Sequence, residues 1–142
     1  MKKKRENCFK RKKLYFDEFV WHLILGFWIL GIFIASGIEG GGKHYYDLAM
    51  LVKRKGAHVF EFFILTYLFW KVLSFYSLKF WQQICLTFLF SFFCASWDEV
   101  HQLFVFGREG KIEDIFIDLV GIFLLLLVIF FVEKKTVRKK AI

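Results

Sequence analysis

Apolar positions along the chain come in four near-continuous blocks, separated by short stretches rich in charged residues and glycine. The blocks cover residues 19–38, 57–76, 80–97 and 115–132. Each is about 18–20 residues long, the length that a helix needs to cross roughly 30 Å of hydrocarbon. Because a segment surrounded by lipid must satisfy its own backbone hydrogen bonds, each block is expected to be a helix. The pattern therefore predicts an all-α protein, a small four-helix transmembrane bundle.

The amino-acid composition argues against a soluble helical protein. Hydrophobic residues make up 58% of the 142 positions, whereas soluble domains are usually about 45–50% apolar. A protein this small has too little interior to bury four such blocks. Proline is absent, so no block is interrupted by it. Gly26 and Gly31 in the first block and Gly121 in the fourth are expected to allow close helix approach.

The distribution of lysine and arginine predicts the orientation. Two basic tails, residues 1–18 and 133–142, flank a transmembrane domain of residues 19–132. Together, the two tails and the turn between the second and third blocks, with Lys71 and Lys79, hold 15 of the 21 lysine and arginine residues. An even number of crossings places both tails on one side, which the positive-inside rule makes the cytoplasm. The net charge of +8 thus indicates topology and attraction to anionic lipid, not nucleic-acid binding.

Ionisable residues gather where the apolar blocks begin and end. In chain order, three sets have helical spacing: His58 with Glu61, Asp98 with His101 and Gln102, and Asp114 with Asp118. Residues three or four positions apart share a helix face, so each set is expected to point into the bundle together. Glu99 is about 100° round the helix from Asp98 and is expected to face elsewhere. The predicted topology puts all three sets on the outer side of the membrane.

These residues supply acid–base groups and cations to one expected site. The candidate catalytic residues are His58, Glu61, Asp98, Glu99 and His101. The candidate substrate-binding residues are Lys55, Gln102, Arg108, Asp114 and Asp118. A histidine that titrates near neutral pH can act as a general base beside a carboxylate. Arg108, in the loop of residues 107–110, is expected to bind a carboxylate or phosphate through two parallel hydrogen bonds.

The sequence favours neither a metal nor a cofactor. His58, Asp98 and His101 offer metal-ligand atoms, but their spacing is not the H-E-x-x-H of a zinc protease. The glycine run of residues 40–42 lacks the Lys-Ser/Thr that follows in a phosphate-binding loop, and is interpreted as a flexible outer turn. No G-x-S-x-G nucleophile motif is present. We therefore predict no metal and no cofactor.

Several of these residues form a recognisable string. The sequence Asp98-Glu99-Val100-His101-Gln102, then Gly107-Arg108, then Asp118 and Gly121, preceded by Arg54-Lys55-Gly56-Ala57-His58, resembles the VanZ-like family of bacterial membrane proteins. The likeness covers about residues 20–131. It implies a small multi-helix protein of the bacterial cytoplasmic membrane, in a family whose founding member confers low-level teicoplanin resistance. Phe106, where the family often has proline, and Trp97, where a smaller residue is common, depart from the pattern.

Three functions fit the predicted site. The first is a protein that alters how the cell surface interacts with a lipoglycopeptide antibiotic or with cell-wall lipid precursors. The second is a membrane-embedded enzyme acting on a lipid-linked phosphate or cell-wall substrate at the outer leaflet. The third is a structural scaffold locked by its ion pairs. The expected partners are the bilayer and an anionic lipid, lipid-linked precursor or lipoglycopeptide, with no nucleic acid and no predicted oligomeric state.

Overall fold

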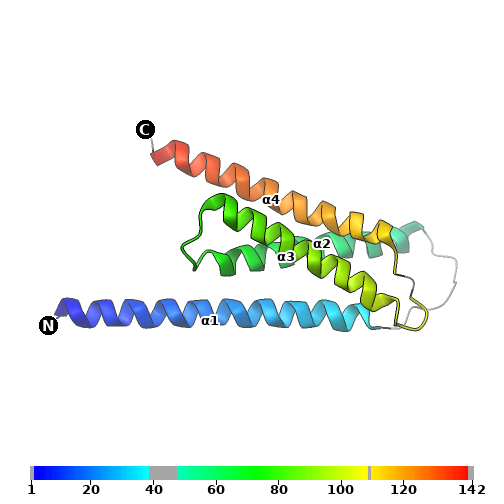
Figure 1. Cartoon of the computed structure of the whole chain (residues 1–142), viewed down its shortest axis with the longest axis horizontal. Helices are drawn as coiled ribbons and strands as arrows, with labels where there is room; N and C mark the ends of the chain where they lie inside the picture. The colour runs from blue at the N-terminus through cyan, green and yellow to red at the C-terminus, as the bar shows by residue number, and fades with distance from the viewer. Residues whose placement is uncertain (1, 39–47, 109, 141–142) are drawn as a thin grey trace.

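A computed structural model of the chain describes residues 2–38, 48–108 and 110–140. These residues form four helices and no strand: α1 (Lys2–Ser36), α2 (Leu48–Leu73), α3 (Phe80–Gln102) and α4 (Ile112–Lys140) (Figure 1). The predicted all-α, four-helix architecture is confirmed. The glycine run of residues 40–42, interpreted above as a flexible turn, lies outside the described residues.

Each helix contains a stretch long and apolar enough to cross a membrane. These stretches are Leu14–Ser36, Val52–Leu73, Phe80–Gln102 and Ile112–Thr136. The helices extend past the predicted apolar blocks because the lysine, arginine, leucine and glutamine residues that flank them are good helix formers. For example, α2 begins at Leu48 rather than residue 57, and α3 continues to Gln102 rather than ending at residue 97. Except for Arg108, the ionisable residues of the expected site therefore lie within helices, on faces that helical packing fixes.

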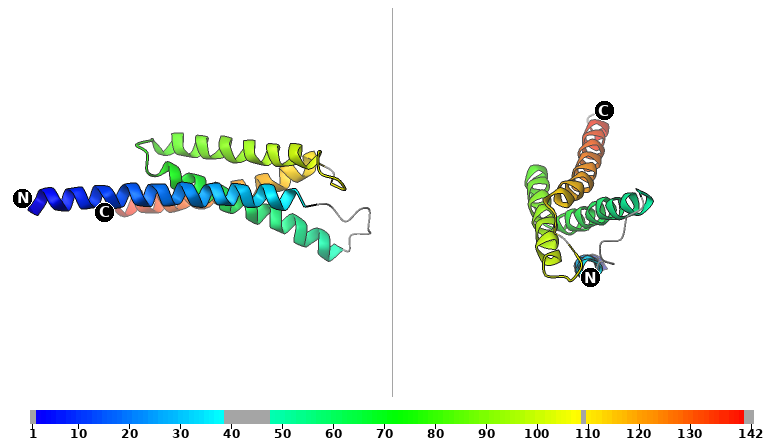
Figure 2. Two further views of the ribbon diagram at one scale, coloured as in Figure 1. Left: turned by 90° about the horizontal axis from the view of Figure 1, so that it is seen from below. Right: turned by 90° about the vertical axis from the view of Figure 1, so that its right-hand side faces the viewer.

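The helices are not equally embedded in the bundle. Helix α2 packs against α3 and α4, which also contact each other, while α1 contacts α2 and more lightly α3 (Figure 2). Between described residues, α1 and α4 make no contact. The two chain termini lie at one end of the bundle (Figure 1). The ends of α1 and α3 and the starts of α2 and α4 lie at the other end, so the predicted clusters share one end of the bundle.

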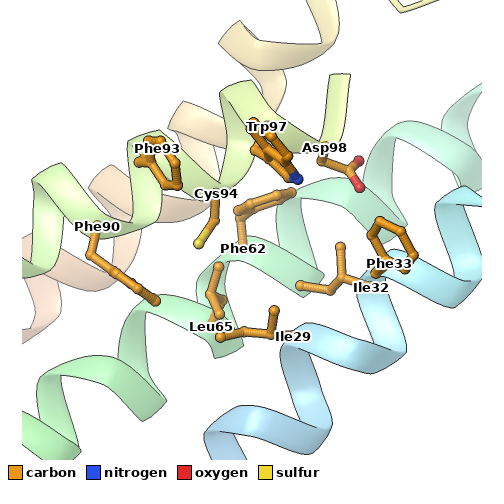
Figure 3. A pocket seen from close by; sticks show the side chains of 10 residues that line it. All are labelled: Ile29, Ile32, Phe33, Phe62, Leu65, Phe90, Phe93, Cys94, Trp97 and Asp98. Carbon is orange, nitrogen blue, oxygen red and sulfur yellow. The ribbon is translucent and has the colours of Figure 1, made fainter. Parts of the chain in front are cut away.

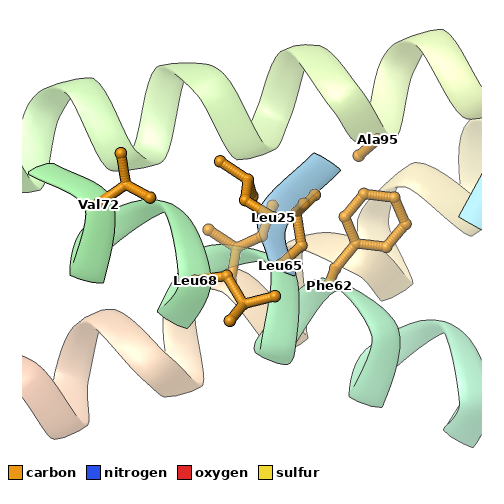
Figure 4. Close-up of a cluster of buried hydrophobic side chains, with 7 residues drawn as sticks. Leu25, Phe62, Leu65, Leu68, Val72 and Ala95 are labelled. Carbon is orange, nitrogen blue, oxygen red and sulfur yellow. The ribbon is translucent and has the colours of Figure 1, made fainter. Parts of the chain in front are cut away.

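The apolar core is centred on α2. Its buried residues are Leu25, Phe62, Leu65, Leu68, Val72, Ala95 and Ile122 (Figure 4). A polar contact crosses the same interior, where Thr66 Oγ1 and Ser91 Oγ are 3.1 Å apart. The Thr66 hydroxyl donates to the Phe62 carbonyl within its own helix and can accept from Ser91. Both hydroxyls are thus satisfied inside α2 and α3, as burial among apolar side chains requires.

At Gly121, the backbone of α4 lies directly against the backbone of α2. A Cβ atom added there would overlap the backbone carbonyl of Val59, and would crowd the backbone of Phe63 as well. The close approach predicted for Gly121 is therefore confirmed. A Cβ atom at Gly26 or Gly31 would meet no atom of another described helix within 4 Å, so the same expectation is wrong for them. Small residues permit close packing only where a second helix is present to use the space.

We expect Gly121→Ala to lower the stability of the bundle by about 1–3 kcal/mol, because the added methyl group forces α4 away from backbone atoms that cannot give way. Thermal unfolding of the purified protein in detergent would measure this loss. Gly26→Ala is the matched control, since it adds the same group to open space and should leave the midpoint unchanged or slightly raised. Equal midpoints for the two variants would contradict the close contact.

Candidate functional site

A hydrogen bond between His58 and Asp118 joins α2 to α4. His58 Nδ1 and Asp118 Oδ1 are 3.2 Å apart, and both residues are buried. His58 is next to Val59, and Asp118 is one turn before Gly121, so the close contact at Gly121 brings these two side chains together. If His58 is protonated, the bond is also an ion pair. A buried carboxylate in an apolar bundle requires such a partner.

A second set of polar side chains closes the end of α3. The Gln102 amide nitrogen donates to Asp98 Oδ2 at 2.8 Å and to Glu99 Oε1 at 3.3 Å. The backbone N–H of Lys111 donates to Glu99 Oε2 at 2.7 Å. All three side chains are buried. The expectation that Glu99 faces away from Asp98 is thus wrong, because both carboxylates turn inward to the same amide.

The two sets form a single cluster. A ring nitrogen of His58 and one oxygen each from Asp98 and Glu99 all lie within 4.8 Å of one another. With Asp118 bonded to His58 and Gln102 bonded to both other carboxylates, five residues from three helices share this space. We call these five residues, His58, Asp98, Glu99, Gln102 and Asp118, the acidic cluster. Its side chains can bind a cation or exchange protons.

His101 lies outside the acidic cluster. Its ring stacks on Phe33 of α1, with centroids 4.0 Å apart, and its Nδ1 is 3.3 Å from Ser36 Oγ. The prediction that His101 points into the bundle with Asp98 and Gln102 is therefore wrong. Side chains spaced three residues apart span a broad face of a helix. On α3, one edge of that face packs against α1 and the other edge packs against α2 and α4.

Among the described residues, Arg108 contacts backbone carbonyls and no carboxylate. Its Nε donates to the Ile38 carbonyl and its Nη2 to the Ala35 carbonyl, each at 3.0 Å. These carbonyls belong to the last turn of α1 and the residues after it, where carbonyls lack the regular hydrogen bonds of a helix interior and attract a cation. The forked geometry expected of Arg108 is present, but it caps α1. Gly107 has φ of 75°, a conformation that favours glycine, in the turn just before Arg108.

The remaining candidates lie around the acidic cluster. Lys55 is exposed one turn before His58, and Asp114 is half-buried in the first turn of α4. Glu61 is half-buried and lines a cavity of about 320 Å³ beside α1. The Glu61 backbone carbonyl accepts a hydrogen bond of 3.1 Å from Trp28 Nε1. Glu61 therefore faces α1, whereas its helical neighbour His58 faces α4.

An apolar cavity of about 260 Å³ ends at the acidic cluster. Residues of α1, α2 and α3 line it: Ile29, Ile32, Phe33, Phe62, Leu65, Phe90, Phe93, Cys94, Trp97 and Asp98 (Figure 3). Asp98 is the one ionisable carboxylate among them, and it lies at one end of the row, with Phe90 towards the other. No pattern in the sequence predicts this cavity, because its lining comes from three separate helices and has no motif spacing.

Comparison with known proteins agrees with this architecture. The family model described as VanZ/LLP1 matches residues 6–133, which include the whole acidic cluster. The chain belongs to the VanZ/LLP1 family. It is also 45% identical over 69 residues to the uncharacterized membrane protein YwnJ of Bacillus subtilis (strain 168), a match covering 49% of this chain and 43% of that protein. No solved structure matches the chain. This VanZ/LLP1 protein is thus a multi-pass membrane protein.

We expect Arg108→Lys to loosen the end of α1, because a lysine cannot donate to both the Ala35 and Ile38 carbonyls as the guanidinium does. Losing a hydrogen bond to a charged donor costs on the order of 1–2 kcal/mol. Hydrogen–deuterium exchange over the last turn of α1 should therefore become faster. Lys55→Gln, which removes an exposed cation at the same end of the bundle, serves as the control and should not change the exchange.

Proposed function

We propose that this VanZ/LLP1 protein binds a membrane amphiphile at the outer leaflet of the bacterial cytoplasmic membrane. Through that binding it alters how the cell surface interacts with cell-wall lipid precursors or with a lipoglycopeptide such as teicoplanin. The observation that carries the proposal is the apolar cavity that ends at Asp98. An amphiphile combines a hydrocarbon chain with a polar head, and the cavity and the acidic cluster offer surroundings suited to each.

The loose packing of α1 supports entry from the bilayer. Most of the apolar span of α1 is exposed, and α1 has no contact with α4 in the described part of the chain. A hydrocarbon chain inside the bilayer can therefore reach the cavity between α1 and α3 without first passing through water. A cavity of about 260 Å³ accommodates part of such a chain and not a whole lipid. The polar head would remain at the bundle end, beside Asp98 and Glu99.

A second candidate is a membrane-embedded enzyme acting on a lipid-linked phosphate, and the His58–Asp118 hydrogen bond favours it. A carboxylate that accepts from one ring nitrogen holds the histidine in place and leaves the other nitrogen to accept a proton from a substrate or water. This candidate requires turnover, whereas the binding function does not. Release of inorganic phosphate from a lipid-linked substrate by the purified protein separates the two.

The proposed outward orientation makes a direct prediction for labelling. In a cysteine-free background, Phe106→Cys should react with a membrane-impermeant thiol reagent added to intact cells, since Phe106 is exposed at the end that carries the acidic cluster. Ser77→Cys is the control at the opposite end, in the turn between α2 and α3, and should react only after the cells are opened. The reverse pattern would place the acidic cluster on the cytoplasmic side and contradict the outer-leaflet proposal.

Drug susceptibility tests the function itself. Cells expressing the wild type should need more teicoplanin for inhibition than control cells, with a smaller change for vancomycin, which lacks the lipid tail. Ile29→Trp fills the cavity and should abolish the difference, as should Asp98→Asn, which removes the charge at its end. Leu30→Trp is the matched control, because Leu30 is exposed next to Ile29 but does not line the cavity.

Equal expression and membrane insertion of all four proteins must accompany that comparison. If Ile29→Trp and Leu30→Trp behave alike, the cavity is not involved in the function. If the wild type changes neither susceptibility, the proposal that the protein alters a teicoplanin-sensitive surface is wrong.

A further inference from the structure

The acidic cluster places two carboxylates and an imidazole unusually close together in a buried position. Asp98 and Glu99 are only 6% and 4% exposed, and His58 is 8% exposed. Their ligand atoms lie within 4.8 Å of one another. Carboxylates held this close inside an apolar bundle repel each other unless a proton or a cation lies between them. The Gln102 amide from which both carboxylates accept offsets this repulsion only in part, so the geometry favours a positive partner at this point.

Two further oxygen atoms at the cluster have no hydrogen-bond partner among the described residues. They are Gln102 Oε1 and Asp118 Oδ2, and both residues are fully buried. Gln102 is anchored at the cluster by the bonds from its amide nitrogen to Asp98 and Glu99, and Asp118 by its bond to His58. Buried oxygens without a partner are rare in folded proteins and call for a ligand that they can accept. Neither oxygen belongs to the three groups that lie within 4.8 Å.

Asp118, the partner of His58, is the kind of hydrogen-bond partner that a metal-binding histidine normally has. Histidines that bind metals usually donate their second ring N–H to a carboxylate, which fixes the tautomer and the orientation of the ring. His58 Nδ1 and Asp118 Oδ1 are at hydrogen-bond distance, 3.2 Å. With Nδ1 donating, the lone pair of Nε2 is available to a cation.

We propose that His58, Asp98 and Glu99 bind one divalent cation, Mn²⁺ or Zn²⁺, with Asp118 orienting His58. One imidazole nitrogen and carboxylate oxygens suit these two ions, and no thiolate takes part to favour Cu⁺. The ligand set differs from the one that the sequence suggested, because Glu99 replaces His101. Three protein ligands leave a coordination position open for water or for an anionic ligand.

A bound cation would also explain how an acidic site accepts a phosphorylated head group. Without one, Asp98 and Glu99 repel a phosphate, and the described contacts of Arg108 are with backbone carbonyls. With one, the phosphate occupies the open coordination position. This consequence rests on the proposed function, whereas the cation site itself does not, because it is inferred from His58, Asp98, Glu99 and their neighbours alone.

Titration of the full-length protein with Mn²⁺ tests the site. The protein is purified in a non-ionic detergent and freed of metal with a chelator. It should then bind about one Mn²⁺ per chain, measured by loss of the electron paramagnetic resonance signal of free Mn²⁺. Zn²⁺ should displace it. Asp98→Asn and Glu99→Gln, which keep the side-chain shape, should each weaken Mn²⁺ binding at least about tenfold. Glu113→Gln, an exposed carboxylate in the first turn of α4, is the control and should bind as the wild type does.

The proposal is overturned if the wild type binds no Mn²⁺, or if Asp98→Asn and Glu99→Gln bind Mn²⁺ as the wild type does. Shared protons would then be the partner of these carboxylates. Circular dichroism and gel filtration establish that each variant is folded. If a variant does not fold, the rise of the wild-type unfolding midpoint with added Mn²⁺, and its absence in the presence of chelator, decides the question. None of these measurements involves the drug phenotype, so the cation site and the proposed function can fail separately.

Discussion

The contact between Gly121 and the Val59 carbonyl is the constraint on which the functional end of this bundle depends. It sets the distance between α2 and α4, and it lies one turn from Asp118 and one residue from His58. A larger residue at Gly121 would separate two polar side chains whose burial is tolerable only while they are bonded to each other. Helix packing and polar chemistry are therefore not independent here. The absence of a side chain at Gly121 permits both the close helix packing and the bond between His58 and Asp118.

The need of buried polar side chains for hydrogen-bond partners also explains why the acidic cluster lies near the helix ends rather than in the middle of the helices. A carboxylate in hydrocarbon is costly, and it needs donors that a helix interior cannot provide. At this end the loop between α3 and α4 supplies the backbone N–H of Lys111 to Glu99, and Gln102 supplies its amide one turn beyond Asp98. Farther inside, the buried polar side chains of the described residues are small hydroxyls, among them Thr66, Thr87 and Ser91. The polarity of the bundle thus decreases with depth from the end that carries the cluster.

Local pattern was enough to predict the number of helices and the grouping of charged residues at one end, because hydrophobic blocks and helical spacing are properties of consecutive residues. It was not enough to assign faces on α3, which packs against three helices. Glu99 and His101 exchanged their expected roles for that reason. The partners of Arg108 are about seventy residues away along the chain, at the end of α1, so no spacing rule could connect them. Space around Gly26 was likewise decided by which helix lies opposite, not by the glycine itself.

The light packing of α1 gives the bundle two regions of different character. Helices α2, α3 and α4 hold the acidic cluster through buried hydrogen bonds, while α1 covers the apolar cavity. Helix α1 contacts the rest of the bundle through Arg108, through the hydrogen bond from Trp28 to the Glu61 carbonyl and through the bond between Tyr76 and His22. Outward movement of α1 would break these contacts, but none of the hydrogen bonds within the acidic cluster. A hydrocarbon chain entering beside Ile29 and Ile32 would then displace only α1. Asp98 belongs to both regions, since it lines the cavity and accepts a hydrogen bond from Gln102. A molecule bound in the cavity would therefore affect the acidic cluster through Asp98.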